Sequence, residues 1–212
     1  MSSDLRRPVL RYHGGKWRLA PWIMTFFPSH RMYVEPFGGG GSVLMRKPRS
    51  YAEVYNDLDG EVVNVFRVLR DPLCSAMLEE QLRLTPFARD EFEDAYESTS
   101  NPVEQARRTI IKAFMGFGSA SIHNTTGFRT LATTRPPTGF RSNSNRSGTT
   151  PAHDWANYPE QIANFCDRLA GIVIENRDAR ALISQHDNPE ALFYVDPPYP
   201  FGTRSDHGKD YT

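Results

Sequence analysis

Four consecutive glycines that follow a short apolar segment restrict the folds open to this chain. Tyr33 and Val34 are predicted to form a strand, Gly38 to Gly41 a tight turn, and Ser42 the start of a helix. A strand, a glycine turn and a helix in this order open the βαβ unit of α/β proteins, in which backbone N–H groups and a helix N-terminus face a nucleotide-like ligand. Because the G-x-G-x-x-G spacing of dinucleotide folds is absent, a nucleotide-dependent oxidoreductase is the least favoured interpretation.

Three later segments are also predicted as strands, and each leads into an acidic residue. They cover residues 53–56, 172–175 and 193–195, and are followed by Asp57, Asp178 and Asp196. Since the carboxyl ends of parallel strands share one edge of a sheet, where α/β proteins bind ligands, these carboxylates are candidate site residues. Asp57 follows the glycine turn by about twenty residues, the position of the acid that holds ribose hydroxyls in nucleotide folds. Asp57 or Asp59 can take this role, or can cap the next helix.

The last of these strands leads directly into Asp196-Pro197-Pro198-Tyr199. The two prolines end the strand, because neither can donate a ladder hydrogen bond and each fixes φ. We therefore expect a buried, central strand with Asp196 at its carboxyl end and Tyr199 just beyond it. A carboxylate, fixed carbonyls and an aromatic ring together suit a flat ring that bears an amine. The alternative is a strand and a proline turn with a solvated aspartate.

Hydrophobic periodicity predicts helices between and after the strands. The first covers residues 16–27, with Leu19, Ile23, Phe26 and Phe27 on one side. The others cover residues 60–70, 73–83, 87–97, 102–117, 158–170 and 179–185. Residues 118–158 are instead rich in Gly, Ser, Thr, Asn, Pro and Arg, which makes this segment too long for a simple connection in a compact domain.

The charge distribution points to a nucleic acid partner although the net charge is zero. No acidic residue occurs between Glu104 and Asp154, a stretch that contains Arg107, Arg108, Lys112, Arg129, Arg135, Arg141 and Arg146. A local basic segment can neutralise phosphates, and Arg and Asn side chains read guanine and adenine edges. Phe140 and Trp155 could hold or wedge bases. The alternative is a linker whose charges pair with acids elsewhere.

Other features exclude several classes of protein. No apolar run approaches the length of a membrane span, and the N-terminus lacks the apolar core of a signal peptide. Cys74 and Cys166 are isolated in the sequence, so neither a disulfide framework nor a cysteine-type metal site is indicated. We therefore expect a cytoplasmic protein that does not associate with membranes.

Four motifs in order resemble those of the Dam-type family of N6-adenine DNA methyltransferases. They are Tyr12-His13-Gly14-Gly15-Lys16, then Val34-Glu35-Pro36-Phe37 with the glycines and Ser42-Val43, then Asn56-Asp57, then Asp196-Pro197-Pro198-Tyr199. The resemblance runs from about residue 9 to the last residue. It implies a Rossmann-like α/β fold that uses S-adenosylmethionine, with a catalytic domain at 1–70 and 158–212. A mainly helical DNA-recognition region is inserted at 71–157.

The resemblance also implies partners and residue roles. Double-stranded DNA is the expected partner, in a prokaryotic or phage context, and a restriction endonuclease of the same system is a further one. Contacts to S-adenosylmethionine are expected from Tyr12, Lys16, Glu35, Phe37, Gly38, Gly40, Asp57, Asp178 and Asp196. Catalysis is expected from Asp196, Pro197, Pro198 and Tyr199. DNA contacts are expected from Arg129, Phe140, Arg141, Asn143, Asn145 and Arg146.

The chemistry of these residues agrees with the implied reaction. Asp196 can accept one hydrogen of the adenine N6 amine and the Pro197 carbonyl the other, while Tyr199 stacks on a base flipped out of the duplex. S-adenosylmethionine carries its own leaving group, so the reaction needs no metal. The family continues beyond the catalytic motif, whereas this chain stops soon after it, so we expect the later strands to be missing. The alternatives are a non-catalytic remnant that binds cofactor or DNA, and a methyltransferase for RNA or a protein amide.

Overall fold

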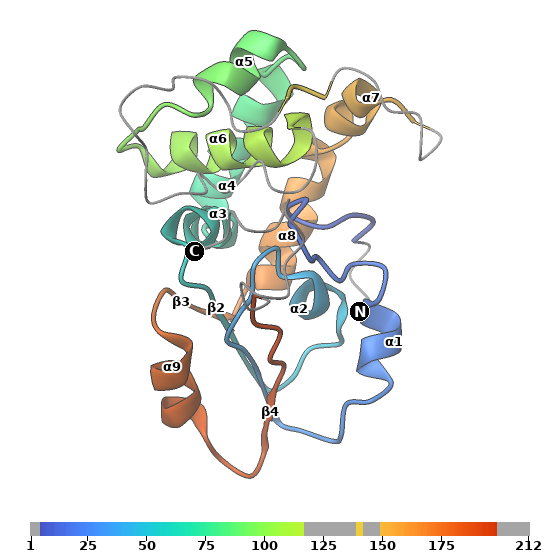
Figure 1. Cartoon of the computed structure of the whole chain (residues 1–212), viewed down its shortest axis with the longest axis vertical. Coiled ribbons are helices and arrows are strands. Elements are labelled where there is room, and N and C mark those ends of the chain that lie inside the picture. Colours follow the sequence, from blue (N-terminus) through green and yellow to red (C-terminus); the bar gives the residue numbers. More distant parts are fainter. Residues whose placement is uncertain (1–4, 117–138, 142–148, 199–212) are drawn as a thin grey trace.

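A four-stranded parallel sheet forms the base of the protein (Figure 1). The computed structural model describes residues 5–116, 139–141 and 149–198. The strands are β1 (Met32–Glu35), β2 (Ala52–Asn56), β3 (Val173–Glu175) and β4 (Ala191–Phe193), arranged in the order β3-β2-β1-β4. In register, Val34 of β1 lies between Val54 of β2 and Phe193 of β4. These strands confirm the predicted α/β class.

The direction in which the chain builds the sheet reverses at β1. From β1 it proceeds through β2 to β3 on one side, and then returns to add β4 on the other side. The point between β1 and β4 is therefore a topological switch point, where open α/β sheets bind ligands. The expectation that β4 is buried and central was wrong. Within the described residues it is an outer strand that pairs with β1 alone, and its side chains are only half-buried.

Side chains that alternate along the strands divide the interior into two parts. Tyr33 and Tyr55 face a large hydrophobic cluster, whereas Val34 and Val54 pack with Leu182 on the opposite face. Leu182 belongs to α9 (Ala179–His186), which is the helix that packs on that face within the part of the chain that the structure describes. The helices α1 (Ala20–Met24) and α2 (Ser42–Arg46) lie on the other side of the sheet (Figure 1).

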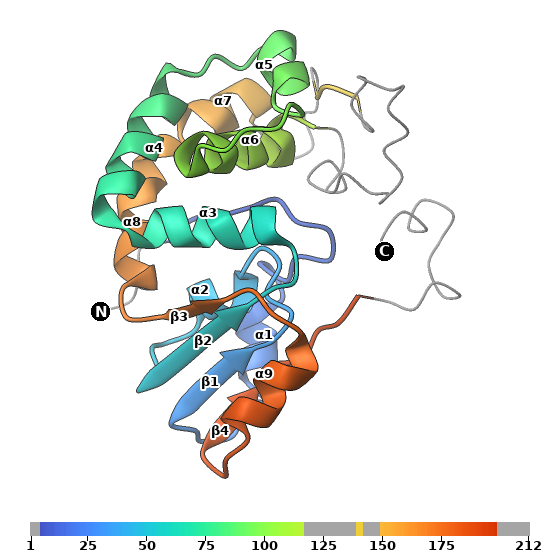
Figure 2. The same cartoon turned by 90° about the vertical axis from the view of Figure 1, so that its left-hand side faces the viewer.

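A layer of helices stands above the sheet, and Figure 2 shows it from the side. Here α3 (Gly60–Arg70) packs against α6 (Pro102–Met115) and α8 (Ile162–Leu169), and α4 (Pro72–Leu84) packs against all three. The short helices α5 (Arg89–Asp94) and α7 (Pro151–Ala156) lie against α6, and η2 (Pro159–Gln161) precedes α8. The large hydrophobic cluster runs through this layer as well as onto the sheet.

The long helices begin at capping side chains that the sequence contains locally. Asp59 accepts hydrogen bonds from the first turn of α3, and Asn101 accepts them from the first turn of α6. Asp71 and Asp178 cap α4 and α9 in the same way. Such caps satisfy N–H groups that have no partner inside the helix. They explain why the predicted helices at 60–70, 73–83, 102–117 and 179–185 are confirmed.

Three helices differ from their predictions, and one of them is α5, which has six residues where a helix at 87–97 was predicted. The helix predicted at 16–27 is reduced to α1, and Leu19 and Phe26 are exposed instead of forming a buried face. In contrast, α7 lies within a segment predicted to be irregular, where Thr150 caps it. Its Trp155 is buried and donates from Nε1 to the Thr85 carbonyl at 2.8 Å. Trp155 is therefore a core residue and not a base contact.

The N-terminal segment connects the two layers. Arg7 and Arg11 both bind the carboxylate of Asp154 in α7, each at 2.7 Å. The Tyr158 hydroxyl donates to the Val9 carbonyl at 2.7 Å. These contacts hold the segment that leads to Tyr12 against the helical layer. Within the described ranges, no helix is both long enough and apolar enough to cross a membrane.

Candidate active site

The first and last sequence motifs meet at the carboxyl edge of β1 and β4. Tyr194 extends the ladder beyond β4, because its N–H donates to the Val34 carbonyl at 2.9 Å. Asp196 follows two residues later, beside the glycine turn that leaves β1. Lys16 Nζ lies 2.7 Å from Asp196 Oδ2 and also donates to the Gly14 carbonyl at 2.6 Å. The structure thus brings two predicted site residues from opposite ends of the chain into one ion pair.

The glycine turn is pressed between aromatic side chains. A Cβ at Gly38 would lie 2.2 Å from the Tyr55 ring, and one at Gly41, where φ is 62°, would lie 2.9 Å from Phe66. The Tyr12 ring lies against Gly39 in the same way, and the Tyr12 Cβ lies against Gly40. Only glycine fits at this approach. Tyr55 also donates from its hydroxyl to the Gly39 carbonyl at 2.6 Å, a role that no local sequence pattern signals.

Two N–H groups of the turn bond within the protein, which differs from the prediction that they face a ligand. The Gly38 N–H donates to the Asn56 carbonyl at 2.8 Å, and the Gly39 N–H donates to Asp57 Oδ2 at 2.7 Å. Asp57 Oδ1 accepts the N–H of Asp59 at 2.9 Å. Burial raises the pKa of Asp57 above its ordinary value. Asp57 therefore shapes the turn, and its carboxylate, which also accepts from the Leu58 backbone, has lone-pair capacity left for a ligand hydroxyl.

Asn56 joins the ends of three strands. Its amide donates to the Pro36 carbonyl after β1 at 2.8 Å and to the Arg177 carbonyl after β3 at 3.0 Å. Its carbonyl oxygen accepts the Arg177 N–H at 3.0 Å. The side chain is buried. Asn56 belongs to one of the four motifs, but its positioning role is evident only from the sheet order.

Glu35 lies behind the turn and not at its open side, contrary to the expected cofactor contact. It is 2% exposed, and its Oε2 accepts the Tyr33 hydroxyl at 2.9 Å and the Leu44 N–H at 3.1 Å. Burial raises the pKa of Glu35 to about 8. The packing of β1 against α2 encloses the carboxyl group, so Glu35 supports the first turn of α2.

Asp178 is another predicted cofactor contact with a different observed role. It caps α9 and pairs with Arg180, which lowers its pKa. It follows β3, whereas Asp196 follows β4, and these are the two outer strands of the described sheet. The structure therefore does not bring Asp178 and Asp196 together. Phe37 is half-buried at the end of β1, next to the turn.

The remaining catalytic and DNA-contact predictions are only partly described. Pro197 and Pro198 are exposed after Asp196. Phe140 packs against Phe87 and Phe92, with ring centroids 5.2 and 6.0 Å apart. A ring held in such a cluster anchors its segment and is not free to wedge between bases. Predicted residues outside the described part of the chain are Tyr199, Arg129, Asn143, Asn145 and Arg146.

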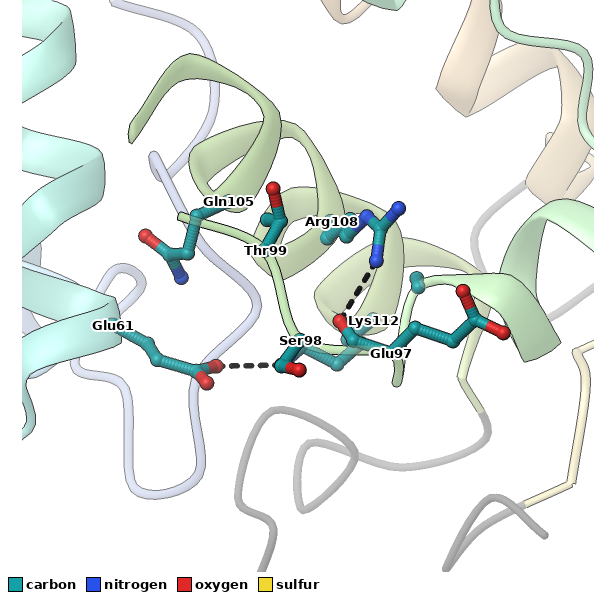
Figure 3. Close-up of a pocket in the computed structure, with 8 residues that line it drawn as sticks. Glu61, Glu97, Ser98, Thr99, Gln105, Arg108 and Lys112 are labelled. Atoms are coloured by element: carbon teal, nitrogen blue, oxygen red, sulfur yellow. Dashed lines mark hydrogen bonds and ion pairs between the residues drawn. The ribbon is translucent and has the colours of Figure 1, made fainter. Parts of the chain in front are cut away.

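The basic residues of α6 pair with acids of the protein. Arg107 binds Glu91 and Glu104, and Arg108 also binds Glu104. Lys112 binds Glu61 of α3 at 2.6 Å across a pocket between α3 and α6 (Figure 3). For these three residues the alternative prediction, that their charges pair with acids of the protein, is therefore confirmed. They do not support the prediction of a DNA contact. Arg141 differs, because its Nη1 is buried without a partner among the described residues.

Comparisons with known proteins extend the evidence beyond this geometry. The chain is 35% identical over 66 residues to the Type II methyltransferase M1.LlaDCHI of Lactococcus lactis subsp. cremoris, covering 31% of this chain and 23% of that protein. It is 27% identical over 70 residues to the DNA N-6-adenine-methyltransferase of Escherichia phage P1, covering 32% and 9%. It is 23% identical over 216 residues to the Type II methyltransferase M.MjaIII of Methanocaldococcus jannaschii, covering 91% and 69%.

The matched part is thus less than a quarter of the first two relatives and about two thirds of the third. A family-wide comparison covers nearly all of the given sequence. The sequence model of the D12 class N6 adenine-specific DNA methyltransferases matches residues 12–210, which include all four motifs. The resemblance stated from the sequence is confirmed, and the chain belongs to the D12 class of N6 adenine-specific DNA methyltransferases.

Proposed function

We propose that this protein transfers a methyl group from S-adenosylmethionine to the N6 amine of adenine in double-stranded DNA. The observation that carries the proposal is the position of Asp196, which lies at the switch point beside the glycine turn and within 2.7 Å of Lys16. Membership of the family implies a methyl donor and a DNA substrate. The position of Asp196 supports a reaction at the carboxyl edge of β1 and β4.

The residues at this edge suit S-adenosylmethionine. The cofactor supplies an electrophilic methyl group on a sulfonium centre that also acts as the leaving group. A cation of this kind is favoured near carboxylates, and Asp57, Asp59 and Asp196 follow β2 and β4 at the same edge. Asp57 can accept ribose hydroxyls with its free lone pairs. We propose Tyr12, Phe37 and Gly40 as further contacts, because Gly40 belongs to the turn, Phe37 directly precedes it and Tyr12 packs against it.

Asp196 is proposed to accept one hydrogen of the N6 amine, and the Pro197 carbonyl the other. Lys16 and Tyr194 both contact Oδ2 of Asp196, at 2.7 and 3.5 Å, and we propose that Oδ1 accepts the hydrogen of the amine. Lys16 orients the carboxylate before the substrate arrives. This arrangement directs the nitrogen lone pair toward the methyl group. General base assistance of this kind contributes about 10²–10⁴-fold to a rate.

The adenine must leave the duplex to reach this edge. We propose that Tyr199 stacks on the flipped base, which is worth about 1–3 kcal/mol in single-strand binders. We also propose that residues 71–157 form the DNA-recognition region, with Arg141, Arg129, Asn143, Asn145 and Arg146 as contacts. Residues 1–70 and 158–212 would then form the catalytic domain. Because two relatives are named Type II methyltransferases, we propose that a restriction endonuclease shares the recognition sequence.

The test replaces Asp196 with alanine. Asp196→Ala should lower methyl transfer by roughly 10²–10⁴-fold, the contribution of a general base, measured as N6-methyladenine formed in duplex DNA by mass spectrometry. Asp187→Ala is the control, because Asp187 is an exposed aspartate at the end of α9. The proposal is wrong if the wild-type protein binds S-adenosylmethionine and methylates only RNA, or no nucleic acid of any sequence.

A further inference from the structure

The short helix α2 cannot provide hydrogen-bond partners for the backbone groups at its own ends. It has five residues, and Gly41 at its N-cap offers no side chain to accept a hydrogen bond. Its C-cap Lys47 is extended, as expected for a residue before Pro48. Isolated helices of this length are not stable in water, and their terminal amide groups need partners. The residues that provide these partners therefore decide where α2 lies.

Leu44 of α2 is held at both of its backbone groups by buried side chains. Its N–H donates to Glu35 Oε2 at 3.1 Å. Its carbonyl would normally accept the N–H of residue 48, but that residue is a proline and has none. Arg168 of α8 supplies the missing donor, because its Nη2 bonds to the Leu44 carbonyl. The Glu35 carboxyl group of β1 and the Arg168 guanidinium of α8 thus replace the bonds that the helix cannot make.

Arg168 is itself fixed by a buried glutamate. Its Nη1 lies 2.7 Å from Glu53 Oε2, and its Nη2 lies 3.0 Å from Glu53 Oε1. Lys47 binds the same carboxylate, and the three side chains are only 2–3% exposed. Burial alone would raise the pKa of Glu53, but the hydrogen bonds from Arg168 and Lys47 hold it below its ordinary value. Glu53 therefore stays ionised and presents a rigid, two-point acceptor.

Stability alone does not explain this cluster. Buried ion pairs give little net stability, because desolvation of the charges offsets their attraction. In addition, Arg168 Nε is buried and has no partner among the described residues, which is unfavourable. The cluster does hold α2 in a fixed position relative to β2 and α8. That position determines the glycine turn, because the Met45 N–H donates to the Gly41 carbonyl at 2.9 Å and the Gly41 N–H to the Gly38 carbonyl at 2.8 Å.

We propose that Arg168, held by Glu53, is a positioning residue for the methyl-donor site. It fixes the Leu44 carbonyl, and through α2 it fixes the glycine turn beside Asp196. Arg168 itself is buried against α2 and does not touch the donor. This inference rests on the proposed function, because it assigns the turn to the binding of S-adenosylmethionine.

The experiment measures cofactor affinity and the exchange of α2 amides in the full chain. Arg168→Met removes the donor to Leu44 but keeps a long side chain. We expect the Kd for S-adenosylmethionine, measured by calorimetry, to rise about tenfold, the effect of one unsatisfied buried acceptor. Hydrogen exchange of residues 43–47 should accelerate by a similar factor. Arg168→Lys, which keeps one donor and the charge, should fall between the wild type and Arg168→Met and serves if Arg168→Met does not fold.

A second substitution tests the Leu44 carbonyl directly. Pro48→Ala restores a backbone N–H at residue 48 and removes the restriction on Lys47. In the Arg168→Met background it should return the Kd to within about threefold of the wild-type value. Lys112→Met is the matched control, because Lys112 is an equally buried cation whose partner Glu61 lies in α3 and not near α2. It should leave the Kd for S-adenosylmethionine unchanged.

Two results would overturn the positioning role. One is an unchanged Kd in both Arg168 variants although α2 exchanges faster. The other is an equal rise of the Kd in Lys112→Met, which would mark a general effect of losing a buried charge. A wild-type protein that binds S-adenosylmethionine but methylates no DNA would refute the proposed reaction, and the positioning role could still be tested by cofactor affinity. A wild-type protein that does not bind S-adenosylmethionine would refute both.

Discussion

The helices α2 and α6 obtain the same kinds of hydrogen bond in opposite ways. α6 has fourteen residues, an asparagine cap, Glu104 in its first turn and Lys112 in its last turn. These features lie within the helix or next to it in sequence, and the charges suit the helix dipole. In contrast, α2 has five residues between a glycine and a proline, and its partners come from β1 and α8. The end bonds of α6 are thus encoded locally, whereas those of α2, the helix that follows the glycine turn, come from side chains in other elements.

The site itself explains this difference. A capping side chain at Gly41 would need a residue with φ of 62°, and its Cβ would lie 2.9 Å from Phe66. The turn must stay narrow to fit between Tyr12 and Tyr55. Local capping is therefore incompatible with the glycine turn, and support from Glu35 and Arg168 replaces it.

The largest difference between the two regions is expected when one methyl group is added to each, in the glycine turn before α2 and at the start of α3. Gly38→Ala places a Cβ 2.2 Å from the Tyr55 ring, and overpacking of this kind should cost about 3 kcal/mol or more and abolish cofactor binding. Gly60→Ala at the start of α3 meets only Asn176 Oδ1 at 3.6 Å. It should raise stability by up to about 0.5 kcal/mol, since alanine favours helices. Urea denaturation and calorimetry measure both effects; equal losses in the two variants would contradict the comparison.

A smaller effect is expected from the proton on Glu35. Its folded-state pKa is raised to about 8, so the native state holds this proton more tightly than the unfolded chain. The stability from this group is complete below about pH 4.5 and is lost as the pH rises to about 8, by roughly 1.4 kcal/mol per pH unit between these values. Glu35→Gln stays neutral and can still accept the Leu44 N–H. Its free energy of unfolding should therefore decline less over this range.

Chemical denaturation at pH 5, 6.5 and 8 provides the measurement for Glu35. Glu160→Gln is a suitable control, because Glu160 is exposed in η2. If the wild type and Glu35→Gln show parallel pH profiles, the carboxyl group does not carry a bound proton in the native state, and its role at α2 would be that of a charged cap.

The smallest effect is expected in the locally encoded helix. Asn101→Ala removes the cap of α6 and should cost about 1 kcal/mol. Because α6 is also held by α3 and α4, the helix should remain folded, and the Kd for S-adenosylmethionine should not change. A thermal melt and a calorimetric titration test this. A change of cofactor affinity in Asn101→Ala would show that the two regions are not independent.

Elements whose signals are local were predictable from the sequence. Strands β1 to β3, α3, α6 and α9 follow from apolar periodicity and from caps within a few residues of each helix start, whereas β4 ends at Phe193 and not at the predicted Val195. The meeting of Lys16 with Asp196 was also predictable, because each residue belongs to a motif that the family resemblance assigns to the same site. The ion pair between Lys16 and Asp196 shows that the two motifs do meet at one site.

Features that depend on packing between distant segments were not predictable. Arg168 and Glu53 look like ordinary residues of an amphipathic helix and a strand, and only the docking of α8 beside α2 gives them a role. Tyr55 is likewise an ordinary strand residue until β2 is placed beside the turn. Trp155 was misjudged because its polar surroundings in the sequence hide a buried position. The outer position of β4 depends on strand order, which apolar patterns do not reveal.

The separation of Leu44 and Arg168 along the chain also affects how the protein folds. They are 124 residues apart, and Glu53 and Arg168 are 115 apart. Contacts at such separation form late, because a long loop must close before they contribute. During synthesis, the glycine turn emerges early but lacks its support until α8 has been made and has docked. We therefore expect that a nascent chain cannot retain the proposed methyl donor until α8 has docked beside α2.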